Sequence, residues 1–430
     1  MKQGFLMWSA LVLMIAAAAR AQSSPGPRKL SIADAEAIAL KNNPTISEAR
    51  LNALASQQVT REVRSSYYPQ SFVNLTGVDA LDGSRISAGG LNNPVIYPRL
   101  ADGVDVHQLV TDFGRTSNLV SSARLSAQAQ DQNARATTAE ITLAVDQTFF
   151  QALQSTAVLK VAQQTVATRQ LLVDQVDALT KAKLKSDLDL SFAKVNLAQA
   201  QLLLMDAQNR QKAALAVLSA VLGYQTQQEF DLVEGTEALS SPPADVDPLV
   251  SEAMAHRPEV AAAQFELEAA QKFHNAEHDL FYPNIQAVGT VGQAPVRVNQ
   301  LPSHYGAAGF NIQIPVFNGF LFHARAQEAD LRAQAAAQHL LDWKTRIARD
   351  VRTAWLDATT AFARMDVTHQ LLDQANLALE LAQTRYNLGL GSIVELSQAQ
   401  VQQTQAQIDD ASARYEYQIA ESDLRFQIGM

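Results

Sequence analysis

The sequence repeats one long pattern of elements, and this repeat constrains the possible folds more than any other feature of the chain. Pro258 lies 214 residues after Pro44, and Gly429 lies 206 residues after Gly223. Further pairs recur at nearly the same spacing: Tyr68-Pro69 with Tyr282-Pro283, and Gly114 with Gly319. Similarity at fixed spacing indicates two copies of one supersecondary unit.

Helical periodicity, interrupted by proline and glycine, predicts the same order of elements in both copies. We expect the first repeat over 22–223, with helices in 31–67, strands in 71–113, a long helix over 114–181 and a medium helix over 188–222. A linker over 224–246 precedes the second repeat, 247–430, with helices in 247–281, strands in 284–316, a long helix over 319–388 and a medium helix over 392–428.

The second long helix carries an apolar seam between Ile347 and Tyr386. Eleven of its twelve positions are apolar and follow a 4-3 spacing: Ile347, Val351, Ala354, Ala358, Ala361, Met365, Thr368, Leu372, Ala375, Leu379, Ala382 and Tyr386. The equivalent positions 206 residues earlier, from Ile141 to Thr180, include eight apolar residues. Such a seam predicts helices that pack lengthwise. Because many seam residues are alanine and the remaining surface is polar, we expect the wall of a hollow helical barrel.

Four segments alternate between apolar and polar residues, as half-buried strands do: 73–77, 104–107, 285–291 and 310–314. Each extends to roughly 9–11 residues, the length of a membrane-crossing strand. The alternative is two ordinary hairpins on a sheet surrounded by water. Four strands cannot close a membrane barrel, whose smallest known forms have about eight, so membrane insertion would require several copies.

The N-terminus predicts export and the composition narrows the partners. Residues 1–21 resemble a signal peptide, with an apolar core and a cleavage pattern at Ala19-Arg20-Ala21. The chain has no cysteine, so it has neither a disulfide nor a lipid-bearing cysteine. Loss of Lys2 and Arg20 with the signal would change the formal net charge from −9 to −11, which gives nucleic-acid binding no support.

These features together resemble the TolC-like family of outer-membrane efflux proteins, the outer-membrane factors, in their non-lipidated form. The matching segments are 30–35, 42–44, 109–115, 314–319, 385–396 and the two Tyr-Pro junctions. The resemblance implies a mostly α fold with a β membrane part. Long antiparallel helices of a homotrimer would form an α-helical barrel, continued by a twelve-stranded β-barrel with four strands from each chain.

The resemblance also implies a function without catalysis, cofactor or metal. It is that of a passive, water-filled exit duct of a tripartite efflux or type I secretion system. The duct would lie in the outer membrane of a Gram-negative bacterium, in contact with its lipid, and have a long periplasmic portion. Its partners would be a periplasmic adaptor and an inner-membrane transporter.

By the same resemblance, the turns between long and medium helices form a periplasmic tip that docks on the adaptor. The residues at these positions are Lys183, Leu184, Lys185, Ser186, Gly389, Leu390, Gly391 and Ser392. Glu395, its repeat partner Asp189 and the neighbouring Asp187 are the expected gate residues. Gln398 stands where some family members have a further acid. Lys183 and Lys185 replace the two glycines of the second turn, which leaves the geometry of the first turn open.

Two other functions are compatible with parts of the sequence. A periplasmic coiled-coil scaffold without a pore would use the long helices but has no use for lipid-compatible strands. A secreted metallopeptidase is suggested by His274-x-x-Glu277-His278 alone. Because the positions 214 residues earlier are Thr60, Val63 and Arg64 and no third ligand is evident, a structural role for the histidines is favoured.

Overall fold

The computed structural model describes residues 28–79, 85–88, 91–95, 99–235, 239–294 and 302–430. The predicted signal peptide, 1–21, lies outside these ranges. The chain divides into two compact units. The first contains Ile141–Pro242, Asp357–Ser422 and the segment that ends at Asn43, and the second contains Pro44–Glu140, Pro243–Leu356 and Asp423–Met430.

The two units do not coincide with the two sequence repeats, because each unit takes part of both. Helices α4 (Arg115–Lys181) and α8 (Leu321–Asn387) have 67 residues each and pass through both units. Elements of both repeats therefore pack together within each unit, so neither repeat has a separate core.

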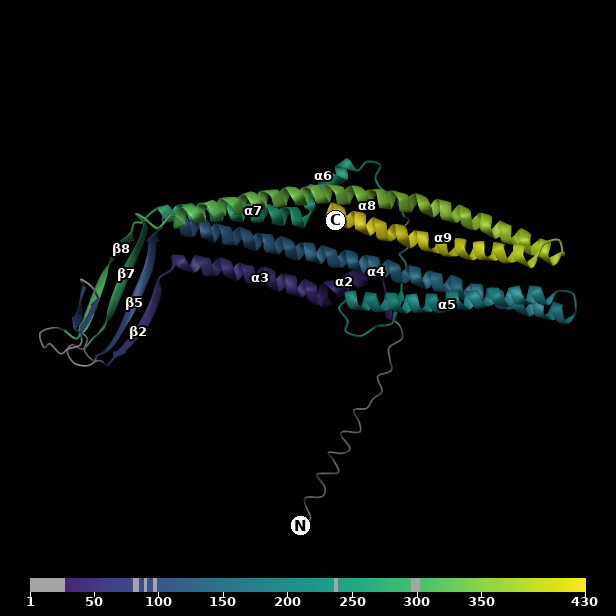
Figure 1. Ribbon diagram of the computed structural model, residues 1–430, viewed down its shortest axis with the longest axis horizontal. Coiled ribbons are helices and arrows are strands. Elements are labelled where there is room, and N and C mark those ends of the chain that lie inside the picture. The colour runs from purple at the N-terminus through teal and green to yellow at the C-terminus, as the bar shows by residue number, and fades with distance from the viewer. Residues whose placement is uncertain (1–27, 80–84, 89–90, 96–98, 236–238, 295–301) are drawn as a thin grey trace, which may run out of the picture. The chain divides into compact units, whose positions relative to one another are not determined.

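The second unit contains a four-stranded antiparallel sheet in the order β2-β5-β7-β8 (Figure 1). The strands are β2 (Gln70–Val78), β5 (Arg99–Thr111), β7 (Asn284–Gln293) and β8 (His304–Gln313). β5 pairs with β7, so the sheet joins the hairpins of the two repeats. β2 and β8 are its edges, and each is paired on one side only among the described residues.

The register places most apolar side chains on one face and most polar ones on the other, as the alternation predicts, although Asp102 and Gln108 share the apolar face. Val73, Val104 and Val291 are cross-strand partners and share one face. Large side chains on this face lie open, with Val73 exposed by 73% and Leu75 by 78%. The opposite face carries Phe72 and Val288 but is otherwise mostly polar. There Asn74 donates a hydrogen bond to Asp105, whose partner on β7 is Thr290, and the face also carries His107, Gln286, Asn311 and Gln313.

Two short pairs of strands were not expected. β3 (Arg85–Ala88) and β4 (Leu91–Val95) pair with each other between the predicted strand segments 73–77 and 104–107. β1 (Arg28–Leu30) pairs in parallel with β6 (Phe230–Leu232) of the linker. Segments of three to five residues are too short to show a period of two, so the sequence pattern could not reveal these pairs.

The second unit also contains five shorter helices. They are α3 (Pro44–Arg64), η1 (Ser65–Tyr67), α6 (Asp247–His256), α7 (Pro258–His278) and η2 (Asp279–Phe281). At the start of α4, the Asp112 carboxylate accepts hydrogen bonds from the Thr116 N–H at 2.7 Å and the Gly114 N–H at 3.3 Å. Asp112 thus caps the helix immediately after β5 ends.

The first unit has its core near α2 (Ile32–Asn42), where this helix meets α4 and α5 (Asp187–Val221). Buried side chains from these helices, from the end of β1 and from the residue after α5 form one cluster with Tyr415 of α9 (Ile393–Ile428): Leu30, Ala35, Ala39, Val145, Phe149, Ala152, Leu153, Leu215, Leu218 and Leu222. The described helices include none with the length and apolar character needed to cross a bilayer.

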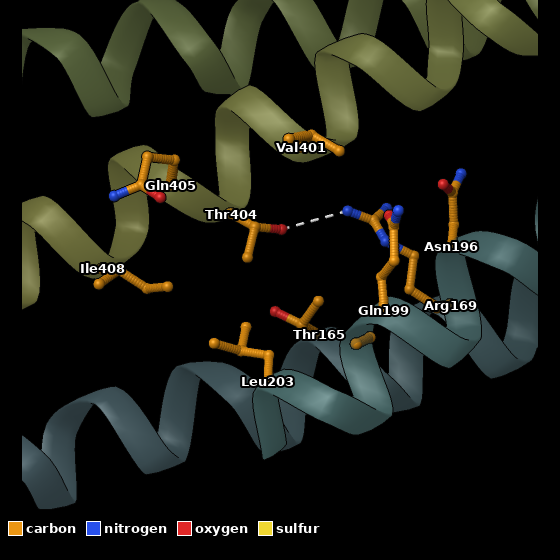
Figure 2. Close-up of a pocket in the computed structure, with 10 residues that line it drawn as sticks. Thr165, Arg169, Asn196, Gln199, Leu203, Val401, Thr404, Gln405 and Ile408 are labelled. Carbon is orange, nitrogen blue, oxygen red and sulfur yellow. Dashed lines mark hydrogen bonds between the residues drawn. The ribbon is translucent and has the colours of Figure 1, made fainter. Parts of the chain in front are cut away.

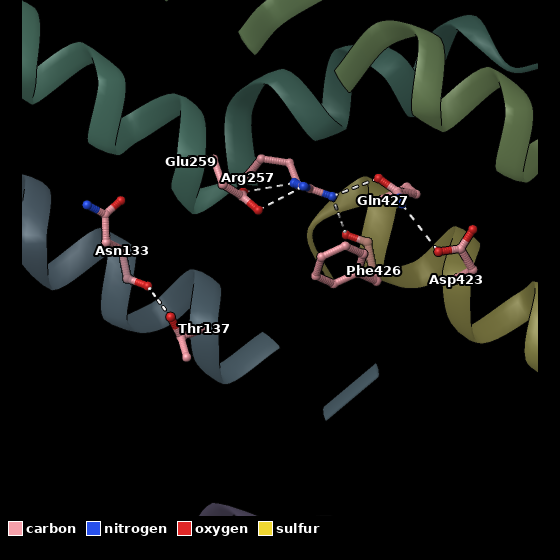
Figure 3. A network of polar contacts seen from close by, with 7 residues as sticks. All are labelled: Asn133, Thr137, Arg257, Glu259, Asp423, Phe426 and Gln427. Atoms are coloured by element: carbon pink, nitrogen blue, oxygen red, sulfur yellow. Dashed lines mark hydrogen bonds and ion pairs between the residues drawn. The ribbon is translucent and has the colours of Figure 1, made fainter. Parts of the chain in front are cut away.

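Both repeats use the same joint between a short helix and the end of a medium helix. The Asn43 side-chain amide donates to Val221 O at 2.9 Å, and Arg257 Nη1 donates to Phe426 O at 3.1 Å. Arg257 also forms a bidentate ion pair with Glu259, with N–O distances of 2.8 and 2.9 Å (Figure 3). Both charged side chains are buried. The side chain before each proline therefore satisfies a carbonyl at a helix end.

Glycine is required where each medium helix ends. Gly223 has φ +85° and Gly429 has φ +84°, a region that side chains with a Cβ avoid. A Cβ on Gly223 would lie 2.7 Å from Asn42 O, and one on Gly429 would lie 3.1 Å from the His256 carbonyl carbon. The two glycines thus permit close contact with equivalent backbone positions.

Candidate functional site

The first of the two turns between helices connects α4, which ends at Lys181, to α5, which begins at Asp187. Ser186 caps α5, since its Oγ accepts from the Asp189 N–H at 3.1 Å. The Asp189 carboxylate accepts in return from the Ser186 N–H at 3.0 Å and the Ser186 Oγ–H at 2.7 Å. This reciprocal capping box holds the Asp189 carboxylate at the helix N-terminus, where the helix dipole favours negative charge.

The second turn repeats this arrangement with one difference. Ser392 Oγ accepts from the Glu395 N–H at 3.1 Å, as Ser186 does from Asp189. The Glu395 carboxylate turns back to α8 and lies 3.1 Å from Arg385 Nε in an exposed ion pair. Repeat-equivalent acids thus occupy equivalent helix starts but have different partners.

A contact between Lys185 and Tyr386 joins the first turn to the end of α8, just before the second turn. The Lys185 ammonium lies 3.7 Å from the centroid of the Tyr386 ring and donates to Tyr386 O at 3.3 Å. Farther along α5 and α9, Asn196 and Ser397 exchange hydrogen bonds of 2.8 and 3.0 Å. An apolar cluster from α4, α5, α8 and α9 packs beneath the turns: Leu172, Val173, Val176, Ala193, Ala382, Tyr386, Ile393, Leu396 and Ala399.

Tyr386 belongs to this site, where the sequence places it both as the last residue of the seam and within the matching segment 385–396. It is buried, and its hydroxyl has no hydrogen-bond partner among the described residues. Burial raises the pKa of Tyr386, and the nearby charge of Asp189 raises it further. The sequence signal for this role is a tyrosine, rather than an aliphatic residue, at the last position of the seam.

The other predicted tip residues lie mostly on the surface. Leu184 and its repeat equivalent Leu390 are 71% and 70% exposed. Lys183 adopts φ +60° and its equivalent Gly389 adopts φ +75°, so the lysine takes the same left-handed conformation as the glycine. Asp187 is exposed at the start of α5, and its carbonyl accepts from Ser191 Oγ at 2.9 Å. The structure brings Asp189 and Lys185 to Tyr386, whereas Asp187 faces solvent.

The histidine pattern on α7 shows no metal centre. Glu277 is buried and lies 3.6 Å from Arg115 in an ion pair, and His274 Nδ1 is 3.3 Å from Ala326 O. Across the described ranges, no group of three metal-binding side chains comes together. These contacts fit a structural role and give the metallopeptidase hypothesis no support.

Comparison with known proteins supplies independent evidence on the family. Residues 37–224 and 249–430 match the family model described as "Outer membrane efflux protein". "Outer membrane protein OprJ" of Pseudomonas aeruginosa is 23% identical over 376 residues, which cover 84% of this chain and 76% of OprJ. "Probable efflux pump outer membrane protein TtgC" of Pseudomonas putida is 24% identical over 378 residues, covering 84% of this chain and 75% of TtgC.

The fold is likewise shared with solved structures. The crystal structure of the outer membrane protein VceC from Vibrio cholerae superposes with a TM-score of 0.79 at 17% identity, covering 93% of this chain and 96% of VceC. The prediction of long helices with a four-stranded β part in each chain is confirmed.

Proposed function

The chain belongs to the outer membrane efflux protein family. From this premise we propose that three copies form one duct, and that the α4–α5 and α8–α9 turns close its periplasmic end. Membership of this family makes the chain an outer-membrane efflux channel, as predicted from the sequence. The number of copies, the gate and the protein partners are the parts that we propose.

The sheet is the observation that carries the assembly proposal. Its apolar face exposes Val73, Leu75 and Phe310, each by more than 70%, and its other face carries amide and carboxylate groups. Such a sheet is stable with lipid on one side and water on the other. Its two edges, β2 and β8, need partners because unpaired backbone groups are costly in lipid. Copies of the same sheet supply them and close the wall.

The same observation argues against the scaffold hypothesis. A coiled-coil scaffold in the periplasm would keep this apolar face in water, where contiguous apolar surface promotes aggregation. The long helices alone are compatible with either function, so the sheet discriminates between them.

Asp187, Asp189 and Glu395 are proposed to form the gate. Each acid lies in the first turn of a medium helix, next to the connection between two helices. Three-fold assembly would place three copies of each around one axis, where like charges raise the local negative potential. The Lys185–Tyr386 contact supports this proposal because it holds the first turn against the end of α8, next to the second turn.

The exposed leucines support a docking role for the turns. Leu184 and Leu390 contribute little to the stability of the isolated chain, because both side chains are exposed to solvent. A periplasmic adaptor would cover them and connect the duct to an inner-membrane transporter. The relative TtgC is named as a probable efflux pump outer membrane protein, which fits such partners.

Membrane fractionation tests the assembly. We expect the full-length protein in the outer-membrane fraction as an oligomer that dissociates on heating before electrophoresis, and a mass of three chains for the detergent-purified complex. A water-soluble monomer in the periplasm would overturn the duct.

Planar-bilayer recording tests the gate separately. The triple variant Asp187→Asn, Asp189→Asn and Glu395→Gln should raise single-channel conductance, because it removes the proposed charges. The asparagine introduced at position 189 can still accept the capping hydrogen bonds through its side-chain oxygen. Three exposed acids elsewhere on the long and medium helices provide the matched control: Asp174→Asn, Asp206→Asn and Glu380→Gln. Equal conductance of the two triple variants would exclude the proposed acids from the gate but would leave the duct intact.

The docking proposal is tested with purified adaptor. Leu184→Ser together with Leu390→Ser should weaken adaptor binding to the trimer, while the exposed control pair Leu171→Ser and Leu381→Ser should not. Equal binding by both variants would place the adaptor elsewhere.

A further inference from the structure

Arg169 on α4 is a buried cation in the first unit that the channel proposal does not use. Only 5% of its surface is exposed. It occupies a seam position whose equivalent 206 residues later is Ala375. The arginine is therefore not needed by the repeated packing pattern, and its role is specific to the first repeat.

The guanidinium has hydrogen bonds but no counter-ion among the residues that the structure describes. Nη2 donates to Gln400 O at 2.8 Å and to Thr404 Oγ1 at 3.1 Å, both on α9 (Figure 2). Nε and Nη1 have no acceptor within the described part of the chain, and none of its carboxylates forms an ion pair with Arg169. Burial lowers the pKa of Arg169 to about 10, so the group stays charged at neutral pH.

Arg169 lines a pocket of about 180 Å³ between α4, α5 and α9. Figure 2 shows side chains from these helices around the space that the guanidinium enters. The polar part of the lining is uncharged apart from Arg169: Thr165, Asn196, Gln199, Thr404 and Gln405. The apolar part consists of Ala200, Leu203, Val401 and Ile408. The pocket thus combines one cation with an apolar wall and has no acid in its lining.

We propose that this pocket binds one small organic carboxylate, which pairs with Arg169 and places its apolar body against Leu203, Val401 and Ile408. The planar fork of a guanidinium matches a carboxylate, and a buried cation gains most from a partner that neutralises it. The size also fits, since cavities of about 150 Å³ accept a benzene ring. An inorganic anion would satisfy the charge but leave the apolar wall without contacts.

The first test measures ligand binding to the purified full-length protein in detergent, independently of transport. We expect benzoate to raise the unfolding temperature in a saturable way, because a ligand that binds only the folded state stabilises it. Benzamide has the same shape without the charge, and sulfate at equal ionic strength has charge without an apolar body. Neither should reproduce the shift. No response to benzoate, or an equal response to sulfate or benzamide, would overturn the proposal.

Variants locate the binding. Arg169→Met should abolish the benzoate shift, whereas Arg364→Met, at a half-exposed arginine of α8 in the same unit, should retain it. Ile408→Trp fills the pocket but keeps Arg169, so it should also abolish the shift and serves if Arg169→Met does not fold. A full benzoate response in Ile408→Trp, or in folded Arg169→Met, would overturn the assignment of this pocket.

Discussion

The ammonium of Lys185 lies 3.7 Å from the centroid of the Tyr386 ring and donates a hydrogen bond to the carbonyl of the same tyrosine. The lysine belongs to the first turn and the tyrosine to the last turn of α8. One side chain therefore fastens the turn between α4 and α5 to the end of α8 by two contacts. Because Lys185 replaces the glycine that its repeat equivalent Gly391 provides, this contact breaks the symmetry of the repeats.

Replacing Lys185 should loosen the first turn. Lys185→Met removes a cation–π contact worth about 1 kcal/mol, so amide hydrogen exchange over 183–190 should become about fivefold faster. Lys194→Met, at an exposed lysine on α5, should leave exchange in the turn unchanged. Equal exchange in wild type and Lys185→Met would show that the contact does not hold the turn.

Lys183 should be a site where glycine stabilises the protein. A residue with a Cβ costs roughly 1 kcal/mol in the left-handed region, and Lys183 has φ +60°. Lys183→Gly should therefore raise the unfolding temperature, and Gly389→Lys should lower it because Gly389 has φ +75°. Lys183→Ala is the control, since it removes the side chain but keeps the Cβ. A gain in stability with alanine equal to that with glycine would refute the strain argument.

Alanine at the ends of the medium helices should be costly. Gly223→Ala combines a left-handed backbone with an approach of 2.7 Å to Asn42 O, so we expect a loss of about 2 kcal/mol in stability. Gly429→Ala should cost less, because the nearest backbone atom would be 3.1 Å away. Gly235→Ala, with open space around its position, is the control. Equal unfolding temperatures for all three variants would contradict the argument.

The Tyr386 hydroxyl should titrate above the ordinary tyrosine value of about 10. Burial raises its pKa, and Asp189 contributes through its charge, so Asp189→Asn should lower the pKa towards that value. Because the folded state holds the proton more tightly, the resulting stability is present below the unfolded pKa and is lost as pH rises through the folded pKa. Ultraviolet difference titration against Tyr386→Phe measures the shift. A Tyr386 pKa unchanged by Asp189→Asn would exclude the charge effect.

The Arg257–Glu259 pair should show strong coupling. Arg257→Met leaves Glu259 buried without its counter-ion, a change that typically costs about 3–5 kcal/mol. Replacing both residues, Arg257→Met with Glu259→Gln, should recover part of that loss because no unpaired charge remains. The loss of the hydrogen bond to Phe426 O would persist in both variants. A double variant no more stable than Arg257→Met would contradict the charge argument.

The seam was predictable from the sequence because it depends on local spacing. All twelve positions from Ile347 to Tyr386 are buried or half-buried, and none is exposed. The same holds for the equivalent positions from Ile141 to Thr180. Strand alternation likewise predicted which side of the sheet carries Val73 and which carries Asp105.

Contacts between distant segments could not be predicted in this way. The sequence indicates that Lys185 and Tyr386 lie near helical turns, but their contact depends on how α4 and α8 pack. The division into two units was also hidden, because a repeat in sequence indicates duplicated elements and not independent cores. Short strands such as β1 and β6 form only because distant segments meet.

The pairing of β5 with β7 sets an order of events during synthesis. Thr111 pairs with Ile285, so roughly 170 residues of the chain must be made before the second edge of β5 is covered. Until then the first hairpin carries apolar side chains and an unpaired strand edge, a combination that promotes pairing with other chains. A chain truncated in its linker would therefore be an aggregation hazard rather than half of a channel, which favours retaining both copies of the duplicated unit in one polypeptide.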